Sequence, residues 1–285
     1  MVPIILDGRK TASKIVDELK SWTEELKERG VTPKLALVMV GDDKYSKRYV
    51  KMKARLCKKV GVKPLVHHLP AETTQLDLLK LIEELNKDPS VHGIMVQLPL
   101  PKGLDELATV EAISPKKDVD GLSPATLGKI LMGEECFLPA GVEAIIELLR
   151  RYGIEPERKH WVITGLSNIV GKPLAALLAN MDVTFTCCQA DNPDLAKYTR
   201  EADVLVVDVE RKWAVTADMV KKDVVVVDNG NNYEGNKVYG DVDFEGVKDI
   251  ASAITPVPGG VGPLLIAMLI RNTLKAAYMT LKRKS

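Results

Sequence analysis

At 285 residues the chain is long enough to form two domains that each bury a core. It carries 40 Lys and Arg against 39 Asp and Glu, so no net field attracts nucleic acid or an anionic membrane, and we expect a small-molecule substrate. The four cysteines show neither a disulfide framework nor a metal-binding spacing, no basic leader opens the chain, and its longest apolar run (261–270) is too short to cross a bilayer. These features predict a cytoplasmic protein with reduced thiols and no bound metal.

The first half of the chain alternates helical and strand-like patterns. A helix is predicted over 9–29, a buried strand over 34–40 and a second helix after Asp43. Thr73 and Thr74 can cap a third helix, and a further strand is predicted over 91–98, ending at Pro99. This order favours an α/β domain with a largely parallel sheet.

A break around 137–141 separates this half from the next, and we place the domain boundary there. A helix follows, and then four short apolar strands over 161–164, 183–186, 204–207 and 224–227. Their spacing is typical of a Rossmann-like dinucleotide-binding domain. We therefore predict two domains with a cleft between them: residues 1–139, completed by a C-terminal helix over 264–285, and residues 140–263.

The second helix carries a lysine among apolar residues. Lys53 falls within the stripe formed by Tyr45, Tyr49, Met52, Leu56 and Val60. A lysine that loses hydration has a lowered pKa and can transfer protons near neutral pH. Tyr49, one turn earlier, could stack on a flat ligand, although a lysine at the rim of a core and a tyrosine within it would give the same pattern.

Polar residues end or follow two apolar segments of the first domain. Gln97 lies at the carboxyl end of the strand over 91–98, where open α/β sheets place their ligands. Its amide could pair with Lys53, or it could bond only to local backbone. Asp118 and Asp120 alternate in a loop before Gly121, where they could read donor groups on a ligand or form a solvated acidic turn.

Two glycine-rich segments belong to the second half. Residues 164–173 join a strand to a helix, a context that favours a pyrophosphate, although Ser167 replaces the second glycine of the dinucleotide fingerprint. Residues 255–263, Thr-Pro-Val-Pro-Gly-Gly-Val-Gly-Pro, combine rigid prolines with glycines that allow close approach of a ligand; a structural turn is the alternative.

Taken together, these motifs resemble those of the bifunctional methylenetetrahydrofolate dehydrogenase/cyclohydrolase family over nearly the whole chain. Any one alone is weak, but five in the family's order are highly specific. They are Ser46-x-x-Tyr49-Val50-x-x-Lys53, Val96 to Leu100, Lys117 to Gly121, Gly165 to Pro173, and Thr255 to Pro263.

The resemblance implies roles for these residues. Lys53 would be the general acid/base, Gln97 would hold and tune it, and Asp120 would bind the amino groups of the pterin. Tyr49 would stack on the folate, and the loop around Pro258, Gly259, Gly260 and Gly262 would line the same cleft. The dinucleotide would be bound by the second domain, through Gly165, Leu166, Ser167, Asn168, Ile169, Gly171 and Cys188.

The implied reaction oxidises methylenetetrahydrofolate with NADP or NAD, and then hydrolyses the methenyl product to formyltetrahydrofolate. The family also implies a homodimer. The departures from its pattern lie mainly in the cofactor half: Leu166 stands where the family commonly has Arg, Cys188 where it has Ser, and Glu210 where it has a glycine. The choice between NAD and NADP therefore stays open, with Asp191 as a weak candidate for reading an unphosphorylated ribose.

Three alternatives remain open at this point. The chain could be a cyclohydrolase with weakened or lost dehydrogenase activity, a non-catalytic folate-binding module, or another two-domain dehydrogenase acting on a small acid. A modified pterin could replace folate as the carrier.

Overall fold

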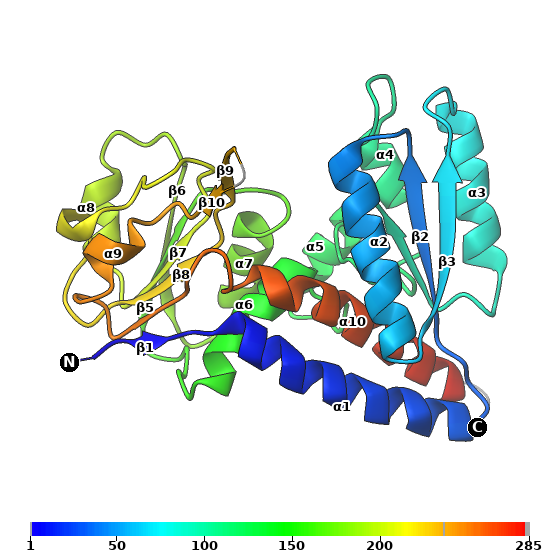
Figure 1. Ribbon diagram of the computed structural model, residues 1–285, viewed down its shortest axis with the longest axis horizontal. Coiled ribbons are helices and arrows are strands. Elements are labelled where there is room, and N and C mark those ends of the chain that lie inside the picture. Colours follow the sequence, from blue (N-terminus) through cyan, green and yellow to red (C-terminus); the bar gives the residue numbers. More distant parts are fainter. Residues whose placement is uncertain (1, 236, 283–285) are drawn as a thin grey trace. The chain divides into compact units, whose positions relative to one another are not determined.

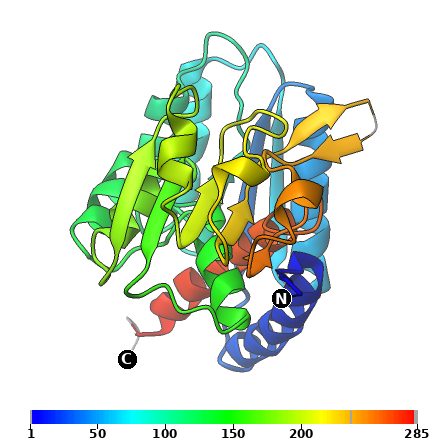
Figure 2. The ribbon, with the colours of Figure 1, turned by 90° about the vertical axis from the view of Figure 1, so that its left-hand side faces the viewer.

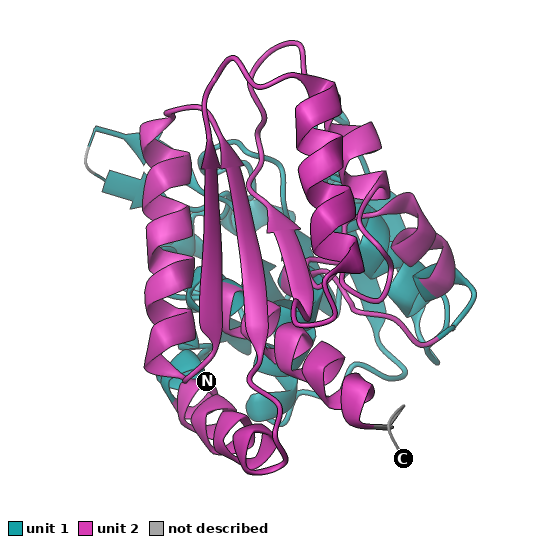
Figure 3. Cartoon of the chain, turned by 90° about the vertical axis from the view of Figure 1, so that its right-hand side faces the viewer, with its two compact units in different colours: residues 1–13, 130–134, 141–265 teal, residues 14–129, 135–140, 266–285 magenta. Residues whose placement is uncertain are grey.

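The computed structural model describes residues 2–235 and 237–282, which fall into two compact units (Figures 1 and 3). Unit 1 comprises Met1–Ser13, Ile130–Glu134 and Gly141–Leu265, and unit 2 comprises Lys14–Lys129, Glu135–Ala140 and Ile266–Ser285. The division differs from the predicted boundaries at Met1–Ser13, which belongs to unit 1 because strand β1 (Ile4–Ile5) pairs with β11 (Ala253–Ile254). Ile130–Glu134 also joins unit 1, where Asn180 Nδ2 donates to Ile130 O at 2.8 Å.

Unit 2 is built on a parallel three-stranded sheet in the order β3-β2-β4. The elements that contribute to it are the end of α1 (Gly8–Glu28), β2 (Lys34–Val40), α2 (Lys44–Lys59), β3 (Lys63–Leu69), α3 (Gln75–Lys87), β4 (Gly93–Val96), α4 (Glu106–Glu111), α5 (Pro124–Leu131) and α10 (Gly262–Lys282). Thr74 caps α3 as predicted, its side chain accepting from Asp77 N. Strand β3 was missed, because as an edge strand it is half exposed and lacks a continuous apolar run.

The two faces of this sheet carry different neighbours (Figure 3). Alternate residues of β2 and β4, such as Val38 and Ile94, pack with Leu78 and Ile82 of α3 in one apolar cluster. Residues of the opposite parity, such as Met95, therefore point to the other face, where helix α2 contacts β2 and β3. This alternation decides which strand residues can meet α2.

Unit 1 contains a parallel six-stranded sheet in the order β1-β11-β8-β7-β5-β6 (Figure 2). Its further elements are α6 (Ala140–Arg151), β5 (His160–Thr164), α7 (Gly171–Leu178), β6 (Thr184–Cys188), α8 (Leu195–Thr199), β7 (Val204–Val207), η1 (Ala217–Met219), β8 (Val225–Asp228), the hairpin β9 (Asn232–Glu234) and β10 (Lys237–Tyr239), and α9 (Phe244–Val247). The fold class, two α/β units with parallel sheets, is as predicted.

The strand order of unit 1 reverses at β5. The chain runs from β5 to β6 on one side and then crosses to β7 on the other side of β5. In open α/β sheets the crevice outside the carboxyl ends of the strands at such a point is where ligands bind. The segments that follow Thr164 and Val207 therefore border the candidate crevice.

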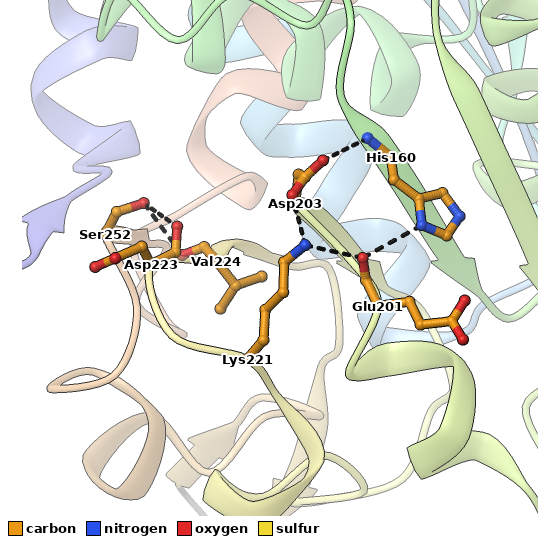
Figure 4. Close-up of polar contacts among 7 residues, drawn as sticks. All are labelled: His160, Glu201, Asp203, Lys221, Asp223, Val224 and Ser252. Carbon is orange, nitrogen blue, oxygen red and sulfur yellow. Dashed lines mark hydrogen bonds and ion pairs between the residues drawn. The ribbon is translucent and has the colours of Figure 1, made fainter.

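A cluster of polar side chains lies at the other end of this sheet, where strands β5 and β7 begin (Figure 4). Asp203 Oδ2 accepts from His160 N at 2.7 Å, and Lys221 Nζ pairs with the same carboxylate and donates to Glu201 O. The hydrogen bonds to His160 and Lys221 hold the pKa of Asp203 below its usual value. This cluster therefore ties together the amino ends of β5 and β7.

Helix α10 is long and apolar enough to cross a membrane by length and composition alone. Its Ala267, Met268 and Ile270 are fully buried in the protein, as in the core helix of a globular fold. Asn272 in the same helix is also buried, and its Nδ2 donates to Val119 O and Leu138 O at 3.0 and 2.9 Å. The helix thus anchors the residue before Asp120 and the segment that precedes α6.

Candidate functional site

Lys53 lies on the buried side of helix α2. The inward stripe of this helix consists of Ser46, Val50 and Cys57, and Lys53 falls between Val50 and Cys57 at helical spacing. The Asp43 carboxylate, which accepts from Ser46 N at 2.7 Å, fixes where the helix begins. The helix register therefore directs the Lys53 amine toward the sheet.

The sequence predicted an apolar stripe on this helix, and the prediction is wrong for three of its residues, which do not face the core. Tyr45, Tyr49 and Met52 are 64%, 43% and 45% exposed, because the buried stripe is turned toward Ser46, Val50 and Cys57. Tyr49 nevertheless lies one turn before Lys53, with much of its ring at the surface. Its ring therefore does not fill the core.

The amine of Lys53 is held by the sheet below it. Its Nζ donates to Gln97 Oε1 at 2.9 Å and lies 3.7 Å from Met95 Sδ. Met95 and Gln97 are two positions apart at the end of β4, so both point to the face that α2 covers. The Gln97 amide is itself fixed, because its Nε2 donates to Leu98 O at 2.6 Å.

Asp120 provides the charge that faces Lys53. Burial raises the pKa of Asp120, the nearby Asp118 adds to the rise, and the positive charge of Lys53 opposes it. Burial likewise lowers the pKa of Lys53, and the negative charge of Asp120 opposes that shift. The site thus brings the amine and the carboxyl group closer to their neutral forms than water would, which suits proton transfer.

Asp118 has a different task from Asp120. It is only 1% exposed, and its carboxylate accepts from Gly121 N, Ser123 N and Thr126 Oγ1 at 3.1, 3.1 and 2.8 Å. Residues 117 and 118 also bridge to β4 through Ile94, which places the loop beside that strand. Asp118 therefore organises the turn that presents Asp120.

The proline and glycine segment 255–263 lies in unit 1 and lines a surface pocket there. Pro258 and Gly262 are exposed there, whereas Gly259 and Gly260 are buried. Gly259 O accepts from Gly8 N at 2.8 Å, and a Cβ on Gly260 would lie 2.7 Å from Thr255 Cβ. Two of the glycines thus serve the local fold, while Pro258 and Gly262 remain at the surface of the pocket.

The glycine turn after β5 is as compact as its sequence indicates. Gly165 has φ +83°, and a Cβ there would lie 1.7 Å from Asp208 O. A Cβ on Gly171 would lie 2.1 Å from Gly165 O, so both positions require glycine. Asn168 and Ile169 at the tip are exposed, and Lys172 Nζ, in the first turn of α7, donates to Asn168 Oδ1.

A side-chain network joins three strand ends at this turn. Ser167 Oγ donates to Asp208 Oδ2 at 2.7 Å, and Asn229 Nδ2 donates to Asp208 Oδ1 at 3.0 Å. These residues follow β5, β7 and β8 respectively. Burial raises the pKa of Asp208, while the hydrogen bonds from Asn229 and Ser167 oppose the shift.

The two departures at the cofactor-side positions differ in exposure. Cys188 is only 4% exposed; its thiol faces Ile163 O within the hydrophobic core, and burial raises its pKa to about 11. Its backbone rather than its side chain meets the turn, since Cys188 O accepts from Gly165 N. Leu166 is apolar and half-buried, and Asp191 is acidic and exposed, so neither residue supplies a cation at this edge.

Glu210 keeps a glycine-like backbone. Its φ is +53°, in the left-handed region, and its side chain is exposed, so its bulk points to solvent. The buried Asp241 carboxylate holds the loop by accepting from Val209 N, Glu210 N and Arg211 N at 2.6 to 3.0 Å. The hydrogen bonds of Asp241 offset the cost of a left-handed glutamate.

Three contributors to these sites were missed in the sequence. Met95 under Lys53 could have been found from its two-residue spacing to Gln97. Asp208 and Asn229 were not predicted as site residues, although each directly follows an apolar strand. In the part of the chain that the structure describes, no three His, Cys, Asp or Glu side chains are grouped so that they could hold a metal ion.

Comparison with known proteins matches both halves of the chain. Residues 6–120 match the model of the tetrahydrofolate dehydrogenase/cyclohydrolase catalytic domain, and residues 139–281 match that of its NAD(P)-binding domain. The bifunctional protein FolD of Nitratiruptor sp. is 48% identical over 96% of this chain and 97% of its own.

Two solved structures are similar over almost their full length. The bifunctional FolD enzyme of Campylobacter jejuni has a TM-score of 0.95 and 46% identity, covering 97% of this chain and 99% of that one. The Trypanosoma brucei dehydrogenase-cyclohydrolase, solved with NADP and an inhibitor, has a TM-score of 0.93 and 34% identity, covering 98% and 99%.

Proposed function

The chain belongs to the tetrahydrofolate dehydrogenase/cyclohydrolase family, and we propose that it oxidises methylenetetrahydrofolate and hydrolyses the methenyl product to formyltetrahydrofolate. The observation that carries the proposal is the amine of Lys53, held by Gln97 and facing the charge of Asp120. A bound nicotinamide would accept the hydride in the first step. The residues of this chain then supply positioning and proton transfer.

Lys53 is the proposed general acid/base of the hydrolysis. Addition of water to the methenyl carbon releases a proton, and opening of the carbon–nitrogen bond requires a proton on the leaving nitrogen. An amine whose pKa is lowered by burial can accept the first proton and return it to the nitrogen. Gln97 supports this role, because its Oε1 fixes the amine without adding a charge that would hold the proton.

Asp120 and Tyr49 are the proposed folate contacts of unit 2. A carboxylate is an acceptor that matches the amino group and ring N–H donors of a pterin, and Asp118 already carries the structural hydrogen bonds of the turn. The exposed ring of Tyr49 can stack on the same flat group. Pro258, Gly259, Gly260 and Gly262 remain proposed folate contacts, supported by the exposure of Pro258 and Gly262.

The backbone of unit 1 fits a dinucleotide. The turn requires glycine at Gly165 and at Gly171, because a Cβ at either position would clash with backbone, and helix α7 begins at Gly171. Leu166, Ser167, Asn168 and Ile169 complete the proposed contact segment. We propose that NAD is used at least as well as NADP, because Leu166 is apolar and the Cys188 thiol is buried, so neither offers a charge to a ribose phosphate.

A second candidate is a cyclohydrolase with weakened dehydrogenase activity. The observation that favours it is Asp208, which places an acidic side chain at the strand ends where the anionic cofactor would bind. The two candidates share the chemistry of Lys53 and differ only in unit 1.

One assay separates them. Nicotinamide reduction is followed with methylenetetrahydrofolate at matched NAD and NADP concentrations, while methenyl formation and its hydrolysis are recorded separately. Reduction followed by hydrolysis supports the bifunctional enzyme, and a preference for NADP would contradict the proposed use of NAD. Hydrolysis of added methenyl compound without nicotinamide reduction supports the second candidate. If neither reaction is detected, a folate-binding module without catalytic activity is the remaining interpretation.

The homodimer and the cytoplasmic location remain proposals. Sedimentation of the purified chain tests the first, and fractionation of the source cells tests the second.

A further inference from the structure

Asp208 occupies a distinctive position in unit 1. It follows β7 directly, next to the strand β5 at which the strand order reverses. Its backbone is in contact with the glycine turn, since Asp208 N donates to Thr164 O at 2.9 Å and Asp208 O lies where a Cβ of Gly165 would be. Its side chain therefore belongs to the crevice at the carboxyl ends of the strands.

The side chain of Asp208 is coupled to the start of helix α7. Ser167 Oγ donates to Asp208 Oδ2 and accepts from Val170 N at 3.1 Å, with a longer contact of 3.4 Å to Gly171 N. The backbone N–H groups at a helix start are those that ordinarily bind a phosphate. Here they are partly occupied by a hydroxyl whose own proton is directed to a carboxylate of the same chain.

The charge of Asp208 would also weaken the binding of a phosphate at this helix start. Burial raises the pKa of Asp208, and the hydrogen bonds from Asn229 and Ser167 oppose that shift; the ionised carboxylate repels a pyrophosphate. Lys172 supplies a positive charge in the first turn of α7, but its Nζ is directed to Asn168 Oδ1. The crevice thus combines a backbone shaped for an anion with an anion of its own.

We infer that Asp208 is a residue that sets the affinity of this chain for nicotinamide dinucleotides, and that it lowers this affinity by occupying the helix start through Ser167 and by charge repulsion. The inference rests on the proposed function, because it assumes that unit 1 binds the dinucleotide. It predicts that the dehydrogenase step of this chain requires a high dinucleotide concentration, while methenyl hydrolysis does not.

The test compares Asp208→Asn and Asp208→Ala with the unchanged chain. Asparagine keeps the shape and removes the charge, and alanine also removes the partner of Ser167. Asp249→Asn is the matched control, since Asp249 is an exposed carboxylate of unit 1 just before the amino end of β11. Binding of NAD and of NADP is measured by calorimetry, dinucleotide KM by nicotinamide reduction, and folding by thermal unfolding.

We expect Asp208→Asn to bind both dinucleotides about tenfold more tightly or better, which corresponds to about 1.4 kcal/mol, and Asp249→Asn to bind as the unchanged chain does. Asp208→Ala should shift in the same direction, which guards against a folding defect in one variant. Equal or weaker binding by both folded Asp208 variants overturns the inference and leaves the proposed function intact. Absence of dinucleotide binding in every protein, with methenyl hydrolysis present, overturns both the inference and the dehydrogenase half of the proposed function.

Discussion

Lys53 Nζ donates to Gln97 Oε1 over 2.9 Å, and this pair joins the second helix of unit 2 to the end of its β4 strand. A neutral amide partner orients the amine but contributes no negative charge. The lowered pKa of Lys53 therefore follows from burial, with Asp120 as the opposing charge. The predictions for unit 2 depend on this arrangement.

Removal of the amine should stop the hydrolysis. Lys53→Met keeps the length and the apolar stem, and we expect the kcat for methenyl hydrolysis to fall by about 10² to 10⁴, the usual contribution of a general acid/base. Lys51→Met, two residues earlier on the exposed side of the same helix, should retain its rate. Hydrolysis by Lys53→Met at the rate of the control would exclude the assigned role.

A charge at position 97 should move the pH profile. In Gln97→Glu the new carboxylate stabilises the ammonium form of Lys53 and raises its pKa. The limb of the kcat profile that requires the neutral amine should therefore move to higher pH, and Gln97→Leu, which adds no charge, should lower the rate without that move. If the pH profile of kcat is the same for Gln97→Glu as for the unchanged chain, the contact between Gln97 and Lys53 does not control the pKa of the amine.

The two carboxylates of the 118–120 turn should separate binding from stability. Asp120→Asn should raise the folate KM by about 10- to 100-fold, as expected for loss of a charged hydrogen bond, with little loss of stability. Asp118→Asn should instead lower the free energy of unfolding by about 2 to 4 kcal/mol, because it leaves buried donors poorly matched. Denaturant unfolding and steady-state kinetics on both variants check this, and the reverse assignment of effects would refute it.

The glycine turn should tolerate no side chain. Gly165→Ala combines φ +83° with a Cβ 1.7 Å from Asp208 O, and we expect a loss of about 3 kcal/mol or more in unfolding free energy together with loss of dinucleotide binding. Gly153→Ala is the matched control: it has φ +69° but no atom within 4 Å of the added Cβ, so only about 1 kcal/mol should be lost. Similar losses in both would show that the close approach to Asp208 is unimportant.

His92 should make unit 2 sensitive to acid. It is 8% exposed, its Nδ1 accepts from Lys34 N at 3.1 Å, and burial, with Lys117 and Lys34 nearby, lowers its pKa from 6.5 to about 4. The folded state therefore binds this proton less readily than the unfolded chain, so its contribution is present above pH 6.5 and is lost as the pH falls toward 4. Between pH 7 and 4.5 we expect a loss of about 2 to 3 kcal/mol in unfolding free energy.

Denaturant unfolding at the two pH values, with His92→Gln and His68→Gln compared, measures this contribution. The glutamine at 92 can still accept from Lys34 N and has no proton to bind, so its stability should depend less on pH. The exposed His68 serves as the control. An unchanged pH dependence in His92→Gln would show that other groups cause the acid sensitivity.

Local chemistry made much of unit 2 predictable. Residues 35–40 of the strand 34–40 form a continuous apolar run, and Thr74 marks the start of α3, so both elements could be placed from the sequence. The edge strand β3, the pair β1 and β11 and the hairpin β9–β10 were missed because they are short or half exposed. Strands β1 and β11 owe their structure to pairing between segments that lie far apart in the chain. Pairing between distant segments leaves no periodic pattern in either one.

The candidate site shows the same division. The sequence by itself determined the family, the two α/β units, and Lys53, Gln97 and the glycine turn as candidates, because motif order, apolar runs and glycine spacing are properties of neighbouring residues. Only the tertiary structure decided that the Lys53 amine donates a hydrogen bond to Gln97. It also decided that Asp118 rather than Asp120 makes the hydrogen bonds that hold the turn, and that Asp208 accepts from Ser167 and Asn229. Each of these contacts joins segments brought together by packing, and burial, which sets their pKa values, exists only once the chain has folded.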